Sequence, residues 1–552
     1  MGLARLIADL ANPAAYPDSN NVQAVEVRQT HISMVFLTEN YVYKIKKPIN
    51  LGFVDYSTLD RRHHFCEQEL RLNQRLAPSV YLGVVPITKD ATGRLRMEGQ
   101  GEVAEWAVKM VRLPESASFR ARLRRDELGP EVFEMLARRL AAFHESAQAG
   151  PLVSIFGRFD VVAGNALENL EQSNAQVGTT LGRIVFDRLR ELTESTLDRL
   201  RPTIEARATR GVPRDGHGDL RLEHIYLFPD RMPPEDLIMI DGIEFNDRFR
   251  CGDPVADMAF PFMDLACEGR RDLARVFAEA YFRARSDEEG RELLPFYTAY
   301  RAAVRGKVEG MEASEREVPQ ASQAEALVQA RAHWLLALQE LEKPSRRPCL
   351  VMVGGLPGTG KSTLARGLAE RARFVVIRSD LVRKELAGAG SKAGFEAGIY
   401  TLEWTVRTYA ECLRRAEAHW FDGDRVLIDA TFRTEASRRL FLDTAEKWGI
   451  PAQLFICRAG QEIIRGRLDR RNNDASDAGW TISQEVAARW EDFGALTRSS
   501  TREIPTGGSI DEALDAALEV LHELGIWSPV DHLEHDQPAD ARTGDHVAVE
   551  LG

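Results

Sequence analysis

The 552-residue sequence predicts two domains of different fold class, followed by a disordered tail. Residues 1–340 begin with strand-like segments and then become mainly helical, which indicates an α+β domain. From residue 346 to residue 527, short apolar strands alternate with amphipathic helices. This pattern is typical of an α/β domain whose parallel sheet is covered on both faces. Residues 528–552 are rich in Asp, His and Pro and poor in large apolar residues, so we expect a disordered tail.

The strands of the first domain are expected near its beginning. Residues 24–47, AVEVRQTHISMVFLTENYVYKIKK, alternate β-branched and aromatic residues with polar ones. A helix is predicted for residues 59–77, a further strand for residues 82–88, and mainly helix after that. Residues 131–147, for example, have apolar side chains at helical spacing. A last helix lies within residues 311–345, and we place the domain boundary near its end.

The second domain is predicted to contain five strands and the helices that connect them. The strands are expected at residues 349–355, 373–380, 425–432, 452–459 and 502–506. Two of the amphipathic helices are expected at residues 400–421 and 511–525.

Charge, cysteine usage and hydropathy exclude several classes of protein. The formal net charge of −12 argues against a surface that coats itself in nucleic acid. The six cysteines are scattered without a CxxC pair, so neither a zinc site nor a disulfide framework is indicated. The chain begins without a signal peptide and contains no apolar run long enough to span a bilayer. We therefore expect a cytoplasmic protein with reduced thiols and no membrane partner.

The second domain contains a complete phosphate-binding loop. The stretch GLPGTGKS, residues 355–362, matches the pattern G-x4-G-K-[ST], with an apolar strand before it and a helix after it. Glycines let backbone N–H groups turn towards phosphate oxygens, and the helix N-terminus adds positive potential. ATP is the expected nucleotide. The nucleotide-binding residues are expected to be Gly355, Gly358, Gly360, Lys361, Ser362 and Thr363.

Other side chains of the second domain are candidates for metal binding and catalysis. Ser362 and Asp429, which ends the third strand, are the expected Mg²⁺ ligands. Asp380 ends the second strand and is a candidate base for an acceptor hydroxyl, although it could simply cap the next helix. Arg467 and Arg471, from an arginine-rich segment, are candidates to stabilise the charge on a transferring phosphoryl group. The alternative for such a segment is a solvated helix face.

The first domain carries a second set of motifs. In HGDLRLEHIYL, residues 217–227, Asp219 is expected to accept or orient an acceptor hydroxyl. In the next strand, LIMIDGIEFND, Asp241 is expected to bind Mg²⁺. Asp253 precedes a proline and is typical of a helix N-cap, and Asp257, one turn later, is a candidate anchor for the loop of Asp219.

These motifs support two family resemblances. Residues 1–340 resemble the aminoglycoside phosphotransferase-like branch of the protein-kinase fold, on HGDLRLEHIYL, LIMIDGIEFND, VYKIKKP and FCEQELRLNQRLAP. Residues 346–527 resemble the small P-loop kinases that include polynucleotide 5′-kinase, gluconate kinase and the zeta-toxin group, on the P-loop, RSDLVRK, LIDATF and the arginine-rich segment. In this order, the two domains resemble a fused bacterial protein with both parts.

The first resemblance implies a lysine that binds phosphate and a glutamate that pairs with it. Lys44 is the preferred lysine, with Lys46 as the alternative, because both lie on one strand face. Glu69 is the preferred partner, with Glu67 as the alternative. The sequence departs from the family in having no glycine-rich loop before the lysine strand. It also has His224 where the family has a metal-binding asparagine.

His224 has three interpretations. It could ligate a metal through an imidazole nitrogen, hydrogen-bond to Asp219 or Asp241 and hold the loop, or mark a site that has lost its second metal position. Mg²⁺ prefers oxygen ligands, and imidazole suits softer metals. Orientation and loss together are therefore favoured over ligation.

An ATP- and Mg²⁺-dependent phosphotransferase is the leading hypothesis, acting through the second domain on an unidentified acceptor with a hydroxyl group. The first domain is then either a second kinase, which would make the protein bifunctional, or a recognition module. One alternative is a regulatory switch ATPase. Another is a nucleic-acid 5′-end kinase, but the acidic balance and the lack of clustered aromatic residues count against it.

Overall fold

A computed structural model describes most of the chain, in two compact units. The described residues are 2–17, 22–52, 54–315, 318–388, 401–470 and 479–533. The first unit consists of Met1–Gln172 with Thr193–Val304, and the second of Ser173–Leu192 with Arg305–Gly552.

The first unit begins with an antiparallel sheet of six strands in the order β1-β2-β3-β6-β4-β5. The strands are β1 (Glu26–Gln29), β2 (Ser33–Leu37), β3 (Tyr41–Lys46), β4 (Tyr81–Lys89), β5 (Leu95–Met97) and β6 (Glu102–Val111). Helix α2 (Leu59–Asn73) packs against β4 and β6. Helix α1 (Leu3–Leu10) buries Leu6 and Leu10 against the opposite face of the sheet, with Tyr43 and Ile45 of β3. The alternation of β3 therefore directs Val42, Lys44 and Lys46 away from α1.

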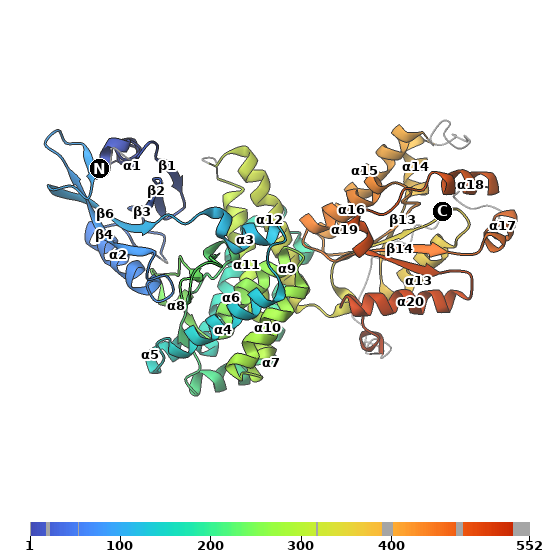
Figure 1. Cartoon of the computed structure of the whole chain (residues 1–552). Coiled ribbons are helices and arrows are strands. Elements are labelled where there is room, and N and C mark those ends of the chain that lie inside the picture. The colour runs from blue at the N-terminus through green and yellow to red at the C-terminus, as the bar shows by residue number, and fades with distance from the viewer. Residues whose placement is uncertain are drawn as a thin grey trace. The chain divides into compact units, whose positions relative to one another are not determined.

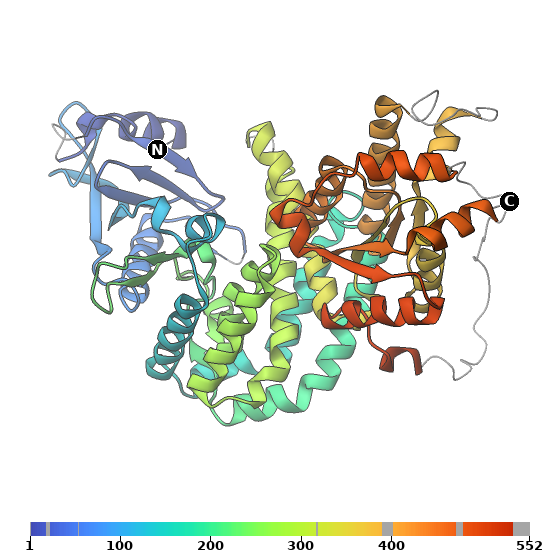
Figure 2. The same cartoon turned by 45° about the vertical axis from the view of Figure 1, so that its right-hand side comes forward.

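The second half of this unit is mainly helical, as Figures 1 and 2 show in teal and green. Its helices are α3 (Phe119–Arg124), α4 (Pro130–Ser146), α5 (Pro151–Ser154), α6 (Phe159–Ser173), α8 (Asp247–Arg250), α9 (Pro254–Cys267) and α10 (Arg271–Arg285), together with most of α7 (Arg183–Thr209) and of α11 (Leu294–Glu312). Two small antiparallel pairs join β7 (Arg214–Asp215) to β10 (Cys251–Gly252), and β8 (Ile225–Leu227) to β9 (Leu237–Met239). A sheet followed by segregated helices is the α+β architecture that the sequence predicts.

The second unit contains a parallel sheet of five strands in the order β12-β13-β11-β14-β15. The strands are β11 (Cys349–Gly354), β12 (Val375–Arg378), β13 (Arg425–Asp429), β14 (Ala452–Arg458) and β15 (Thr501–Pro505), so all five predicted strands are confirmed. The helices are α13 (Lys361–Ala372), α14 (Ser379–Ala387), α15 (Leu402–Phe421), α16 (Glu435–Lys447), α17 (Gln461–Asp469), α18 (Trp480–Ala488), α19 (Ala495–Ser499), α20 (Ile510–Glu523) and α21 (Val530–Leu533).

Helices cover both faces of this sheet, as expected for an α/β domain (Figure 1). Helices α13 and α20 contribute to a core with Cys349, Val351 and Val353 of β11. Helices α15 and α16 lie against β13 and β14. Both faces of β11 are buried, which explains why the strand is apolar throughout.

Helix α12 (Gln320–Leu341) belongs to the second unit. Its Gln339 amide donates to the Gly449 carbonyl at 3.0 Å, and Gly449 also packs against Ala332. The compact units are divided after residues 172, 192 and 304. The predicted domain boundaries, 1–340 and 346–527, stay predictions. The predicted tail lies mainly outside the described residues. Among the described helices, none combines the length and apolar composition needed to cross a bilayer.

Candidate functional sites

The phosphate-binding loop joins β11 to α13 with the backbone conformation that its glycines permit. The φ angles are 136° at Gly355, 84° at Gly358 and 95° at Gly360. A residue with a Cβ rarely adopts these angles. A Cβ on Gly358 would also lie 2.9 Å from the side chains of Ile464 and Leu468. Backbone geometry and close packing by α17 therefore both require glycine at residue 358.

Lys361 and Arg467 both contact this loop. Lys361 is the first residue of α13, and its Nζ donates to the Leu356 carbonyl at 3.2 Å. Arg467, on α17, donates to the Thr359 carbonyl at 3.3 Å and to the Thr506 carbonyl at 2.7 Å. Two cationic side chains are thus in contact with the loop that the sequence assigns to phosphate. Arg471, the other predicted arginine, lies outside the described residues.

The predicted magnesium ligands are both in contact with Arg378, at the end of β12. Arg378 Nη2 lies 3.5 Å from Ser362 Oγ, and its Nε lies 3.4 Å from Asp429 Oδ2. Within the described part of the chain, no cluster of three or more His, Cys, Asp or Glu side chains is arranged to hold a metal ion. One carboxylate and one hydroxyl nevertheless fit Mg²⁺, because this ion usually keeps several waters and binds substrate phosphates as well. Arg378 was not singled out from the sequence.

Asp380 lies in the first turn of α14, and its position disfavours the capping interpretation. The helix begins at Ser379, and its N-cap residue, Arg378, makes no side-chain capping bond. Burial raises the pKa of the Asp380 carboxyl, Lys361 opposes this shift, and Asp429 adds to it. A carboxylate with a raised pKa next to a phosphate-binding lysine is a typical candidate for a general base.

The first unit pairs the lysine and glutamate that the sequence predicts. Lys44 Nζ lies 2.9 Å from Glu69 Oε1 and donates to Asp241 Oδ1 at 2.6 Å. Burial opposes the ionisation of Asp241, but Lys44 and His224 outweigh it and hold the pKa of this carboxyl below its usual range. Glu67, the alternative partner, has a half-exposed side chain and contacts His63.

Lys46, the alternative lysine, lies beside Lys44 and also contacts Glu69, and its second partner, Glu244, was not anticipated. The Lys46 side chain is fully buried and contacts both Glu69 and Glu244, while the Tyr56 hydroxyl donates to Glu244 at 2.7 Å. A buried ammonium group requires a counter-charge. The two lysines on one strand face were therefore a signal that a second carboxylate had to be present. Glu244 supplies it from the segment after β9.

Helix α9 holds the backbone of the loop that carries Asp219. Asp257 accepts hydrogen bonds from the N–H groups of His217 and Gly218, the latter at 2.7 Å, which confirms it as an anchor. Asp264, two helical turns later, accepts a bond of 2.8 Å from the Leu222 N–H. Their spacing of seven residues places the two carboxylates on one helix face. That spacing was the signal by which Asp264 could have been found.

His224 contacts the same loop. Its Nδ1 lies 2.8 Å from the Asp219 carbonyl oxygen, and its Nε2 lies 3.7 Å from Asp241 Oδ2. This bond supports the interpretation in which the imidazole holds the loop. Asp241 itself has a φ of 65°, and its N–H donates to the Tyr81 hydroxyl at 3.0 Å. These contacts bring Asp219, His224 and Asp241 to one place.

The glycine-rich loop that the sequence lacks is replaced by a tight turn. Only Thr30, His31 and Ile32 join β1 to β2. The Thr30 N–H donates to the Ser33 carbonyl at 2.9 Å, and the Ser33 N–H donates to Thr30 Oγ1 at 3.0 Å. A turn of three residues closed in this way has no free backbone N–H groups at Thr30 and Ser33 to bind a phosphate.

Comparisons with known proteins agree with a nucleotide-binding second unit. Residues 350–492 match a protein-family model described as an AAA domain. Over 511 aligned residues, the chain is 32% identical to the uncharacterized proteins Rv2004c of Mycobacterium tuberculosis (strain ATCC 25618 / H37Rv) and Mb2027c of Mycobacterium bovis. The alignment covers 91% of this chain and 95% of theirs, and the chain belongs to the same family as these mycobacterial proteins.

Solved structures with some similarity include proteins named as kinases. A microcompartment-associated aminopropanol kinase is 17% identical, with a TM-score of 0.37, and the match covers 61% of this chain and 97% of that one. A gluconokinase from Sinorhizobium meliloti 1021 is 14% identical, with a TM-score of 0.24, and the match covers 35% of this chain and 98% of that one.

The contacts of the phosphate-binding loop lead to a first prediction. Replacing Lys361 with alanine should weaken ATP binding at the loop about tenfold to a hundredfold, since hydrogen bonds to charged groups contribute about 1.5–3 kcal/mol. Photolabelling of the full chain with 8-azido-ATP, quantified on peptides from residues 355–372, measures this site without interference from the first unit. Lys447→Ala, on the exposed side of α16, is the control. Equal labelling of wild type and Lys361→Ala would show that this lysine does not bind the nucleotide.

Proposed function

We propose that the protein is an ATP-dependent phosphotransferase whose second unit transfers a phosphoryl group to a hydroxyl-bearing acceptor. The observation that carries this proposal is the common edge of three neighbouring strands. Strand β11 ends at the phosphate-binding loop, β13 ends at Asp429, and β12 ends next to Asp380. Ligands of open α/β sheets bind at the carboxyl ends of the strands. A nucleotide, its metal ion and a general base are therefore supported at one edge.

Each side chain at this edge has a role in the proposal. Lys361 binds the β- and γ-phosphates, and Arg467 stabilises negative charge on the transferring group. Mg²⁺, when bound with ATP, would be held by Ser362 and Asp429 and would neutralise charge on the phosphates. Asp380 accepts the proton of the acceptor hydroxyl as its oxygen attacks the γ-phosphorus and the bond to the leaving ADP oxygen breaks.

The role of Asp380 gives a second prediction. Asp380→Asn should leave ATP affinity nearly intact and lower kcat by about 10²–10⁴-fold, because general-base assistance is typically of that size. Thermal unfolding should change little, since Asn replaces Asp without a change in size and α14 has no capping bond to lose. The measurement is steady-state phosphate transfer by the full chain, with ATP labelling as above.

The pH dependence of kcat distinguishes the base from a structural carboxylate. Because the pKa of Asp380 is raised, the base is ionised above that pKa, and kcat should fall as the pH drops through it. The ordinary pKa of an Asp carboxyl is about 3.9. The fall in kcat should therefore occur at a higher pH than that value, and it should be absent in Asp380→Asn. An unchanged turnover in the Asn variant would rule out the base.

The first unit has a second candidate function, as a separate phosphotransferase or a recognition module. The specific observation is the convergence of Lys44, Glu69 and Asp241, together with the anchored loop of Asp219. Asp241 offers a carboxylate to Mg²⁺, and Lys44 contacts the same carboxylate. The tight turn between β1 and β2 argues for a mode of phosphate binding that does not use a glycine-rich loop.

His224 separates these interpretations in a third prediction. If its role is orientation, His224→Asn should retain transfer in Mg²⁺, because an asparagine side chain can also hydrogen-bond to the Asp219 carbonyl. If it ligates metal, wild-type transfer should require Mn²⁺, and the Asn variant should be active with Mg²⁺. If the site has lost its second metal, neither protein transfers phosphate. Phosphate transfer by the full chain with Lys361→Ala, in each metal, measures the first unit alone.

A screen for the acceptor tests the proposal as a whole. Sugars, nucleosides, aminoglycosides and nucleic-acid 5′ ends should be offered to the wild type, Lys361→Ala and Asp380→Asn with labelled ATP. If the second unit transfers the phosphoryl group, the wild type consumes ATP when the right hydroxyl compound is present, and both variants lose that activity. Transfer that both variants retain would belong to the first unit. Slow ATP hydrolysis that no acceptor accelerates would favour a switch ATPase.

A further inference from the structure

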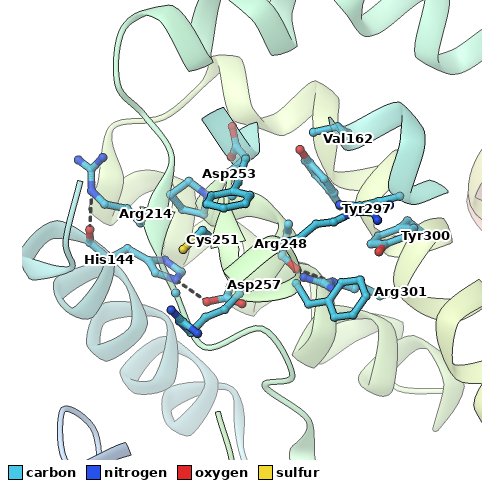
Figure 3. A pocket seen from close by; sticks show the side chains of 18 of the residues that line it. His144, Val162, Arg214, Arg248, Cys251, Asp253, Asp257, Tyr297, Tyr300 and Arg301 are labelled. Carbon is cyan, nitrogen blue, oxygen red and sulfur yellow. Dashed lines mark hydrogen bonds and ion pairs between the residues drawn. The ribbon is translucent and has the colours of Figure 1, made fainter. Parts of the chain in front are cut away.

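The helical half of the first unit encloses a cavity that none of the proposed catalytic groups uses. It lies between α6, α9, α11 and the segment from Arg248 to Gly252, and it opens to solvent (Figure 3). Gly216 and Asp257 are among its lining residues, whereas Asp219 and Asp241 are not. The cavity is therefore next to the anchor of the Asp219 loop and separate from the predicted transfer site.

Arg301 brings a positive charge to this cavity. The residue is only 7% exposed, and its Nε donates to the Ala256 carbonyl at 3.0 Å. Its guanidinium lies 4.2 Å from the ring centroid of Phe260 and 5.3 Å from that of Tyr300. Of the residues that the structure describes, no carboxylate forms an ion pair with it. A buried cation without a counter-ion is costly, and an anionic ligand would remove that cost.

The other charged groups around the cavity already have partners. Arg250 pairs with Asp215, and Arg248 pairs with Glu168 and contacts Asn165. Asp253 pairs with Arg207 at 2.6 Å. Asp257 is occupied by the backbone of the Asp219 loop and by His144. Within the described lining, Arg214 and Arg301 are thus the charged groups without a carboxylate partner. Arg214 donates to four backbone carbonyls, whereas Arg301 donates to one.

Two tyrosine hydroxyls accompany Arg301. Figure 3 shows Tyr297, Tyr300 and Arg301 on one side of the cavity, opposite His144 and Arg214. Tyr297 is only 4% exposed, and neither hydroxyl has a hydrogen-bond partner among the described residues. Burial raises the pKa of Tyr297 and of Tyr300, so both remain O–H donors at neutral pH. A guanidinium and two hydroxyl donors form a set that suits oxygen atoms with negative charge.

The remaining wall is largely apolar. Phe156, Val162, Phe249 and Phe296 contribute to the lining. Small-molecule sites typically combine such walls with a few polar groups that fix the ligand's orientation. The wall suits a ligand with an apolar body attached to its anionic group.

We propose that this cavity binds a small organic anion, a carboxylate or a phosphate monoester, with Arg301 as its counter-ion and Tyr297 and Tyr300 as hydrogen-bond donors. The site is additional to the phosphate-binding loop and to the site of Asp219. The bound anion would lie beside Asp257. Because a ligand that binds only the folded state stabilises that state, the anion should stabilise the first unit.

Calorimetric titration of the full chain tests this proposal. The probes are benzoate, for the carboxylate, and phenyl phosphate, for the phosphate monoester, in a Lys361→Ala background that weakens anion binding at the phosphate-binding loop. We expect one bound molecule per chain for at least one probe, and that probe identifies the chemistry. Arg301→Gln should weaken its binding at least tenfold, because a charge-assisted hydrogen bond is lost.

Tyr297→Phe is a second variant that keeps the proposal testable if Arg301→Gln does not fold. It removes a hydroxyl that has no hydrogen-bond partner among the described residues, so thermal unfolding should change little while probe affinity falls about two- to fivefold. Arg283→Gln, on the exposed surface of α10, is the matched control and should bind like the wild type. The proposal is overturned if neither probe binds, if Arg301→Gln folds and binds equally well, or if Lys44→Ala abolishes binding while Arg301→Gln does not.

Discussion

Buried charge is the constraint on which the first unit depends. Lys44 and Lys46 come from β3, Glu69 comes from α2, and Asp241 and Glu244 come from the segment after β9. Removing one member of such a cluster leaves an uncompensated charge away from water, which typically costs about 3–5 kcal/mol. The cluster therefore ties a strand, a helix and a distant loop to one geometry. Asp241, whose backbone has a positive φ, is placed by this requirement.

A second consequence follows for the Asp219 loop. Its backbone N–H groups are satisfied by carboxylates of α9, and His224 bonds to the Asp219 carbonyl. Buried backbone groups have to be paired, and here side chains supply the partners that a regular strand or helix would otherwise supply. Helix α9 thus supplies the hydrogen-bond acceptors for three backbone N–H groups of the loop. The same helix, through Asp257, also borders the anion cavity.

In the second unit the constraint comes from topology. Parallel strands that are joined by helical crossovers end on one edge, and the order β12-β13-β11 makes the three functional strand ends neighbours. Arg378 then contacts both Ser362 and Asp429, although these residues are far apart in sequence. Each strand end needs only a short polar motif, because the sheet brings the motifs together.

The sequence by itself determined the local features of this protein. The P-loop, the five apolar strands and the pair Lys44 and Glu69 were readable, because glycine conformations, strand periodicity and strand-face alternation act over a few residues. Only the tertiary structure decided the positions and partners of Glu244, Asp264, Arg378 and the pocket of Arg301. Each depends on which distant segment meets a buried charge or an unpaired N–H group. Periodicity along the chain does not encode that choice, because the free energy of satisfying a buried polar group is set by its neighbours in space.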